Sequence, residues 1–294
     1  MRLGQLRLPD FIVIGAEKAG TTWLGSRLDE QQNIFLPYPY ELHYFDHEEN
    51  YVRGPEWYAR HFEPAGENDL VGEKTPGYFW VKRPAAAGPQ NIPERMHKLL
   101  PDVRLILVLR DPVDRAISAL NHAMKHRHLS PFVGADAMFS KAKEIDKDRF
   151  GLFSHGLYAR NLEPYLKLYR REQIHILFFE DDIVGAPDLA LSGTLQFLGR
   201  QVSTPVKKWR AADLLAGKRW WPENKRMNSR AGLVMNYYAP ALSPVISAID
   251  RLLPQQPAIT PSEDTLARLY DYFEPENRAL FDMIGRSTKA WKPA

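Results

Sequence analysis

Runs of apolar residues predict five strands along the chain. Residues 11–14 (FIVI), 103–109 (VRLILVL) and 174–179 (IHILFF) are nearly continuous apolar runs, as expected for parallel strands that are buried on both faces. Residues 34–36 and 70–72 are shorter apolar runs and predict two weaker strands.

Segments with helical spacing alternate with these strands. Residues 21 to about 30, 113 to about 125, and 158–169 carry apolar side chains at a spacing that places them on one side of a helix. Strands that alternate with helices predict an α/β fold, a three-layer sandwich around a central parallel sheet. Ligands in such sheets bind at the carboxyl ends of the strands, where we expect residues 15–22 and 110–114.

The whole chain, residues 1–294, is interpreted as a single domain with one large insertion. Residues 205–261 mix tryptophan, lysine, arginine and proline without strand rhythm, and are predicted to form a lid or an acceptor-binding insertion. Residues 82–94 contain three prolines and a glycine and predict a surface loop.

Composition narrows the class of protein. Of the 294 residues, 44% are hydrophobic and 26% are charged, which predicts a packed core and excludes global disorder. The net charge of +3 fits a site for an anionic ligand, and the lack of a dense stripe of lysine and arginine argues against a nucleic-acid partner. The chain has no cysteine, which excludes disulfides, thiolate catalysis and cysteine-bound zinc.

No segment is predicted to cross a membrane. The longest uncharged segment, residues 231–249, is interrupted by Asn236, Pro240 and Pro244. The apolar run at residues 11–15 is too short for the core of a signal peptide. We therefore expect a cytoplasmic protein, whose oligomeric state the sequence does not predict.

Residues 15–22 (GAEKAGTT) have the glycine spacing of a phosphate-binding loop. Successive backbone N–H groups and the start of the following helix can bind an anion there. A P-loop NTPase places a lysine directly after the second glycine, whereas here Lys18 lies two residues before Gly20, and Thr21 follows it. The loop can bind an anion without the usual lysine and metal arrangement, which suits a sulfuryl donor. The alternative is an ordinary strand-to-helix turn with a capping threonine.

Four segments, taken in order, resemble the superfamily of sulfotransferases that use 3′-phosphoadenosine 5′-phosphosulfate (PAPS). They are residues 15–24 (GAEKAGTTWL), 40–46 (YELHYFD), 72–79 (GEKTPGYF) and 109–122 (LRDPVDRAISALNH). The resemblance is to the heparan sulfate N- and 3-O-sulfotransferase branch, as a bacterial-type member. It implies PAPS as donor, 3′-phosphoadenosine 5′-phosphate (PAP) as product, no metal, and a glycan or small-molecule acceptor.

The resemblance implies a nucleotide site at two strand ends. Lys18 would contact the bridging oxygen and the 5′-phosphate, and Gly20, Thr21 and Thr22 would donate to that phosphate. Arg110 would bind the 3′-phosphate with its guanidinium fork, a geometry that suits a dianion. The other residues that the resemblance places at the nucleotide are Ser118, also on the 3′-phosphate, and Ala19, Trp23, Tyr158 and Arg230.

Several nucleotide assignments have alternatives in the residues themselves. Arg110 could instead pair with Asp111 or Asp114, and Ser118 could be an ordinary helix residue. Arg230 ends an Asn-Ser-Arg segment that resembles a replacement for the basic 3′-phosphate loop of animal members. Its competitors for that role are Lys225 and Arg226.

The resemblance also implies a catalytic group. Glu41 matches the base that takes the acceptor's proton, although Tyr40 replaces the lysine that usually precedes it. A base is needed because a neutral hydroxyl is a poor nucleophile until its proton is removed. Lys74 matches a second active-site lysine, His122 matches a histidine near the transferred group, and we expect Glu73 to form an ion pair that orients Lys74.

A metal site is the alternative for the histidines of this region. His122 and His126 lie four residues apart, with His128 beyond them, but no glutamate follows the first histidine as in a zincin. We therefore predict no metal. The other alternative for His122 is a packed or solvated helix residue.

The predicted reaction is direct in-line transfer, with Lys18 and Lys74 stabilising charge and no covalent intermediate. A P-loop small-molecule kinase is one alternative, which the missing lysine after Gly20 disfavours. An inactive nucleotide- or carbohydrate-binding module is the other, which the intact Lys18, Glu41 and Lys74 disfavour. Aromatic residues near the predicted cleft fit a sugar, a phenol or a lipid headgroup: Tyr38, Tyr40, Tyr44, Trp57, Tyr58 and Tyr78. The tryptophans of the predicted lid could stack on adenine or a sugar, or could be core residues of the lid: Trp209, Trp220 and Trp221.

Overall fold

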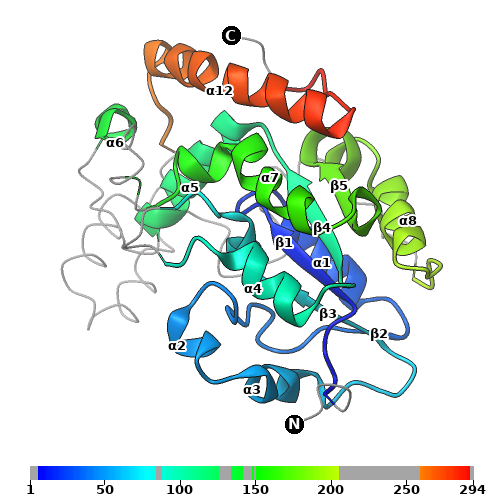
Figure 1. Ribbon diagram of the computed structural model, residues 1–294. Coiled ribbons are helices and arrows are strands. Elements are labelled where there is room, and N and C mark those ends of the chain that lie inside the picture. The colour runs from blue at the N-terminus through cyan, green and yellow to red at the C-terminus, as the bar shows by residue number, and fades with distance from the viewer. Residues whose placement is uncertain are drawn as a thin grey trace, which may run out of the picture.

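A computed structural model describes residues 6–83, 88–125, 134–141, 148, 150–204 and 259–291. Five strands form one sheet in the order β2-β3-β1-β4-β5, and all neighbouring strands are parallel (Figure 1). The strands are β1 (Phe11–Gly15), β2 (Ile34–Phe35), β3 (Leu70–Lys74), β4 (Arg104–Leu109) and β5 (Ile174–Phe178). All five predicted strands are confirmed.

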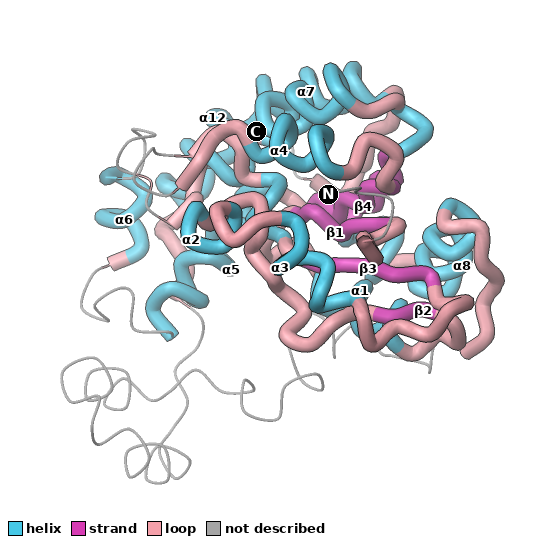
Figure 2. Tube along the Cα trace, turned by 60° about the horizontal axis from the view of Figure 1, so that its bottom comes forward, coloured by secondary structure: helices cyan, strands magenta, loops and turns pink. Residues whose placement is uncertain are grey.

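Helices cover both faces of the sheet, so the three-layer prediction is confirmed. On one side α4 (Ile92–Leu99) and α12 (Glu263–Ile284) pack on α7 (Tyr158–Leu168), and on the other α1 (Thr21–Asp29) packs on α8 (Pro187–Phe197) (Figure 2). The other α-helices in the described part of the chain are α2 (Glu48–Tyr51), α3 (Pro55–Ala59), α5 (Pro112–Lys125) and α6 (Ala135–Lys141).

The core follows the central strands. Every residue of β1 is buried, and so are all residues of β4 after Arg104. Helices cover both faces of a central strand, so every side chain of the strand is buried. These runs are therefore apolar throughout and do not alternate between apolar and polar residues. A second cluster of buried side chains, which includes Val113, Phe153 and Phe273, packs between α5 and α12.

The predicted surface loop at residues 82–94 is too long at its C-terminal end. Helix α4 begins at Ile92, and Pro93 lies in its first turn. Proline is tolerated there because the first helical N–H groups have no partner within the helix. The predicted insertion at residues 205–261 falls almost wholly outside the described residues, so its role as a lid stays a prediction.

No helix among the described residues is both long enough and apolar enough to cross a membrane. The cytoplasmic location stays a prediction.

Candidate active site

The predicted phosphate-binding loop, residues 15–22, joins β1 to α1 at the carboxyl edge of the sheet. Gly20 has φ +98°, and a Cβ there would lie 2.6 Å from the ring of Phe179, so only glycine fits. No side chain caps α1 among the described residues, which leaves its first N–H groups for a ligand. Thr21 is buried and Thr22 is exposed at this helix start, while Ala19 and Trp23 are buried in the core.

Two hydrogen bonds attach the backbone of the loop to neighbouring segments. The N–H of Ala16 donates to the carbonyl of Val108 on β4, at 2.7 Å. The N–H of Glu17 donates to Nε2 of His155, at 3.3 Å, and the His155 ring stacks on Trp80 with 5.6 Å between the ring centres. His155 is buried, and burial lowers its pKa well below the usual value, so the ring is neutral and Nε2 can accept.

Lys18 lies in the loop in the left-handed region, with φ +64°. The residue is half-buried, and burial lowers the pKa of its ammonium below the ordinary value, although Glu17 and Glu41 oppose the shift. A desolvated ammonium is stabilised by an incoming anion, because the anion replaces the water that the lysine has lost. The position and environment of Lys18 therefore fit the predicted contact with a phosphosulfate.

Arg110 follows β4 directly and lies beside the loop. Its Nη1 donates to the carbonyl of Lys18 at 3.4 Å, and its guanidinium lies 5.0 Å from the ring centre of Phe179. The alternative pairing with Asp114 is present only at 3.9 Å. Its Nε is buried and has no hydrogen-bond partner among the described residues. Arg110 thus keeps donor capacity for a phosphate.

Tyr158 and Ser118 flank Arg110. The hydroxyl of Tyr158 donates to the carbonyl of Arg110 at 2.8 Å, and its ring is buried. The structure therefore gives Tyr158 a role in positioning Arg110, and its direct contact with a nucleotide stays a prediction. Ser118 is half-buried on α5, in the helix that starts just past Arg110, and its contact with the 3′-phosphate also stays a prediction.

Glu41 and Lys74 form an ion pair next to this loop. Lys74 Nζ lies 2.5 Å from Glu41 Oε1, and the lysine side chain is 6% exposed whereas the glutamate is 44% exposed. Lys74 ends β3, and its stem passes so close to Gly25 of α1 that a Cβ there would lie 2.8 Å from Lys74 Cδ. The exposed carboxylate is therefore held by a lysine that has almost no freedom to move.

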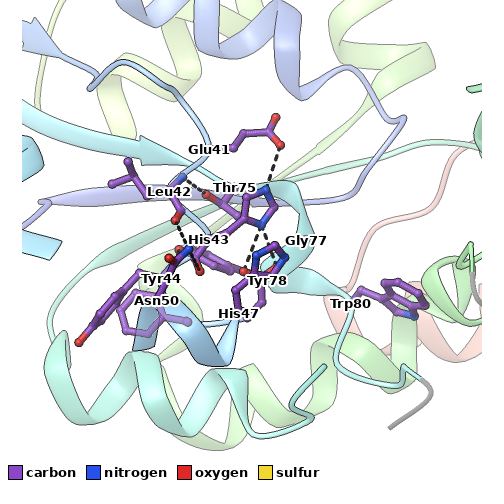
Figure 3. Close-up of polar contacts among 12 residues, drawn as sticks. Glu41, Leu42, His43, Tyr44, His47, Asn50, Thr75, Gly77, Tyr78 and Trp80 are labelled. Carbon is purple, nitrogen blue, oxygen red and sulfur yellow. Dashed lines mark hydrogen bonds and ion pairs between the residues drawn. The ribbon is translucent and has the colours of Figure 1, made fainter. Parts of the chain in front are cut away.

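His43 and Asp46 extend this pair, and sequence reasoning missed both. His43 Nε2 lies 3.7 Å from Glu41 Oε2 (Figure 3). His43 Nδ1 lies 3.2 Å from Asp46 Oδ2. Burial disfavours charge on His43, but its contacts with Asp46 and Glu41 raise its pKa to about 10. The pattern Glu-X-His-X-X-Asp in residues 41–46 was the available signal.

The charges around Glu41 decide its protonation state. Burial alone would raise the pKa of Glu41, but its contacts with His43 and Lys74 outweigh burial and lower the pKa to about 2. The carboxylate is therefore ionised at every physiological pH and has two cations beside it. Such a group can accept a hydrogen bond from an acceptor hydroxyl and orient it before the proton moves.

The sulfotransferase domain family matches residues 8–220, more than half of the chain and a span that contains the loop, Glu41, Lys74 and Arg110. The chain belongs to the sulfotransferase family. The resemblance inferred from the four segments is thereby confirmed, and the family match disfavours the P-loop kinase alternative.

Two relatives and one solved structure show where the chain stands in the sulfotransferase family. Heparan sulfate glucosamine 3-O-sulfotransferase 5 of Mus musculus is 28% identical over 174 residues, covering 58% of this chain and 48% of that protein. Membrane-associated sulfotransferase kil1 of Dictyostelium discoideum is 40% identical over 276 residues, covering 66% of this chain and 56% of that protein. The chain spans about half the length of the curated relatives it matches.

The solved sulfotransferase of Alicyclobacillus acidocaldarius has the same fold. Its crystal structure superposes with a TM-score of 0.67 at 22% identity and covers 97% of this chain and 98% of that one. The α/β architecture of the sheet and its two helix layers is therefore that of a solved sulfotransferase.

The predicted ion pair between Glu73 and Lys74 is wrong. Glu73 is completely buried and accepts hydrogen bonds from the hydroxyls of Tyr58, Thr75 and Tyr78, while Lys74 pairs with Glu41. Successive side chains of a strand point to opposite faces of the sheet, so neighbours on β3 cannot face each other.

Three of the six described aromatic residues that were assigned to the cleft belong to the core instead. Tyr44, Tyr58 and Tyr78 are at most 2% exposed and pack with Phe45, which contradicts their interpretation as acceptor-binding groups. Tyr38 is 90% exposed. The half-buried residues of the set are Tyr40 and Trp57.

The expectation of a metal-free reaction stays a prediction. His43, Asp46 and His47 offer ligand atoms that all lie within 4.8 Å of one another. His122 lies half-buried on α5, and its catalytic role also stays a prediction. The other predicted residues fall outside the described ones: Arg230, Lys225, Arg226, His126, His128, Trp209, Trp220 and Trp221.

Proposed function

We propose that this protein transfers the sulfuryl group of PAPS to a hydroxyl or amine of a carbohydrate acceptor. The observation that carries the proposal is the placement of the phosphate-binding loop beside the Lys74–Glu41 pair. The loop follows β1 and the pair joins the end of β3, and these strands are neighbours in the sheet. An anion site thus lies next to a carboxylate that can activate a nucleophile, in a chain of the sulfotransferase family.

The residues fit a bisphosphorylated nucleotide. Lys18 and the start of α1 supply a cation and N–H groups for the phosphosulfate end. The side chain of Arg110 is 20% exposed, and its guanidinium can supply N–H donors for a second anion. Because Arg110 contacts the carbonyl of Lys18, the two anion sites lie side by side, as one nucleotide with two phosphate groups requires.

The chemistry follows from these groups. In the transfer, the acceptor oxygen or nitrogen forms a bond to sulfur while the bond from sulfur to the 5′-phosphate oxygen breaks. Glu41 accepts the proton that the acceptor loses, and Lys18 stabilises the charge that develops on the departing phosphate. Lys74 and His43 keep Glu41 ionised and aimed, and they stabilise negative charge near the transferred group.

A carbohydrate acceptor is supported by the relatives. The heparan sulfate glucosamine 3-O-sulfotransferase of mouse acts, by its name, on a glucosamine of a polysaccharide. The exposed ring of Tyr38 lies three residues before Glu41 and offers an apolar face of the kind on which sugar rings pack.

The proposal is tested with two measurements on the same preparation. Calorimetric titration compares PAP with ATP plus Mg²⁺, and we expect PAP alone to bind tightly without metal. A screen with sulfur-labelled PAPS and a panel of glycans, phenols and amines then identifies the acceptor, and we expect label in a glycan. Preference for ATP plus Mg²⁺ would favour a kinase, and PAP binding without turnover on any acceptor would favour an inactive binding module.

A further inference from the structure

Glu73 is a buried carboxylate with three neutral hydroxyl partners. It lies on β3 and is completely buried, and it accepts from Thr75 Oγ1 and Tyr78 Oη, each at 2.7 Å, and from Tyr58 Oη. Burial raises its pKa, although the three hydroxyls oppose the shift. Burying a carboxylate costs free energy unless the group is fully hydrogen-bonded. We therefore ask which other groups the three hydroxyls contact.

Two of these hydroxyls also hold the backbone around Glu41. The N–H of Leu42 donates to Thr75 Oγ1 at 3.2 Å, and the N–H of Tyr44 donates to Tyr78 Oη at 2.9 Å (Figure 3). A hydroxyl has one proton, and here that proton is given to Glu73. Its lone pairs are therefore turned toward the loop, and Glu73 fixes the direction in which each hydroxyl accepts.

The residue between these two anchors needs such support. His43 has φ +50°, a left-handed conformation that a side chain with a Cβ rarely adopts. A backbone conformation of this kind costs free energy and persists only where several contacts of the surrounding structure hold it in place. The Nδ2 of Asn50 adds a third hold, since it donates to the carbonyls of Leu42 and His43 at 3.1 and 3.2 Å.

We propose that Glu73 is a positioning residue for the sulfuryl-transfer reaction: through the hydroxyls of Thr75 and Tyr78 it fixes the backbone of residues 41–44. The proposal rests on the proposed function for its effect on turnover. Glu73 itself touches neither donor nor acceptor. It acts by keeping the Glu41 carboxylate against Lys74 and the His43 ring against Asp46.

Tyr58 provides a matched control inside the same network. Tyr58 and Tyr78 are both completely buried, and both donate to Glu73. Only Tyr78 also accepts an N–H of the loop, from Tyr44. Phenylalanine at either position removes the same atom from the same carboxylate, so a purely structural role of Glu73 predicts similar effects, while the positioning role predicts different ones.

The test compares Tyr58→Phe, Tyr78→Phe, Thr75→Val and Glu73→Gln with the wild type. We expect Tyr78→Phe and Thr75→Val each to lower kcat by roughly tenfold to a hundredfold, because small misplacements of reacting groups have effects of this size. Affinity for PAP, measured by calorimetry, should stay within about twofold, since the donor loop is held by other contacts. Tyr58→Phe should keep near wild-type kcat.

Glu73→Gln tests the relay from the other side. The amide oxygen can accept from Thr75 and Tyr78 as Glu73 Oε1 does, and the amide N–H₂ can donate to Tyr58. We therefore expect this variant to keep most of its turnover, whereas Glu73→Leu should lose it. Glu73→Gln as inactive as Glu73→Leu would mean that orientation of the hydroxyls is not what matters, and would overturn the proposal.

Amide hydrogen exchange separates this inference from the proposed function, because it needs no turnover. We expect exchange at the N–H of Tyr44 to quicken in Tyr78→Phe and to stay slow in Tyr58→Phe. A wild type without turnover that shows this exchange pattern would remove the proposed function and leave the anchoring in place. Equal kcat in Tyr58→Phe and Tyr78→Phe, or unchanged exchange at Tyr44 in both, would overturn the positioning role.

Discussion

Replacing Glu41 by glutamine keeps the shape of the side chain and removes its capacity to take a proton. The amide oxygen can still accept from Lys74 Nζ, which lies 2.5 Å from Glu41 Oε1, so the geometry of the loop is retained. Proton transfer to a positioned base contributes about 10²–10⁴-fold to a rate. We therefore expect kcat to fall by about 10²–10⁴-fold.

The same substitution has a calculable effect on stability. Lys74 is 6% exposed and loses its charged partner, and a hydrogen bond to a charged group contributes about 1.5–3 kcal/mol. The lower end applies because Glu41 is 44% exposed and the amide still accepts. A loss of about 1.5 kcal/mol corresponds to a fall in Tm of roughly 2–3 °C for a domain of 294 residues, because the entropy of unfolding is about 2.1 cal/mol/K per residue.

The assay measures kcat, the affinity for PAP and Tm on the same preparations. Glu48→Gln is the matched control, because Glu48 lies in the next helix along and also forms a 2.5 Å ion pair, with Arg95, but is 60% exposed. We expect Glu48→Gln to leave kcat and Tm unchanged, and Glu41→Gln to lower kcat with PAP affinity intact. Full turnover in Glu41→Gln, or a parallel loss of turnover and PAP affinity, would refute its role as the base.

Three further predictions follow from the charges of the site. Lys18→Ala should mainly lower kcat, because the charge of Lys18 matters most as negative charge develops on the leaving phosphate. Arg110→Ala should mainly raise the KM for PAPS, by roughly tenfold to a hundredfold, because a hydrogen bond to a charged group is lost. Steady-state kinetics that show the reverse pattern would exchange the two roles. The pKa of Glu41 is lowered to about 2, so its contribution to stability is present above about 4.5 and is lost as the pH falls toward 2. The pKa of His43 is raised to about 10, so its contribution to stability is present below about pH 6.5 and is lost as the pH rises through 10. The free energy of unfolding, measured with urea, should therefore decline at both the acidic and the alkaline end of this pH range. The His43→Gln variant should lack the alkaline decline. Turnover and PAP binding should be unchanged after dialysis against EDTA, and a loss that Zn²⁺ restores would instead make His43, Asp46 and His47 metal ligands.

The sequence predicted the strands, and the site residues that directly follow them, where a single strand and the loop after it contain all the residues needed for the inference. Continuous apolar runs identified β1, β4 and β5, because strands buried on both faces have no polar side chains to alternate. The parallel order then brought Lys18 and Arg110 to one edge of the sheet, as the structure confirms. Both predictions use only local sequence and the rule that parallel strands end together.

Side-chain contacts between segments that are distant in sequence could not be predicted by the same reasoning. The contact of Glu41 with Lys74 joins residues that are 33 positions apart, and nothing in either segment marks the other as its partner. Glu73 was assigned to Lys74 because they are adjacent in sequence, yet the alternation of a strand turns them to opposite faces. Tyr44 and Tyr78 were interpreted as cleft residues because aromatic residues suit both a core and a sugar site.

The measurement that tests the central claim most directly is the stoichiometry of transfer from PAPS. Sulfur-labelled PAPS is incubated with the acceptor found in the glycan screen, and label in the glycan and PAP released are counted together in the wild type and in Glu41→Gln. The account predicts one PAP for each sulfuryl group transferred by the wild type, with the rate of both reduced in Glu41→Gln. PAP release without label in any acceptor, or equal transfer by the two proteins, would contradict it.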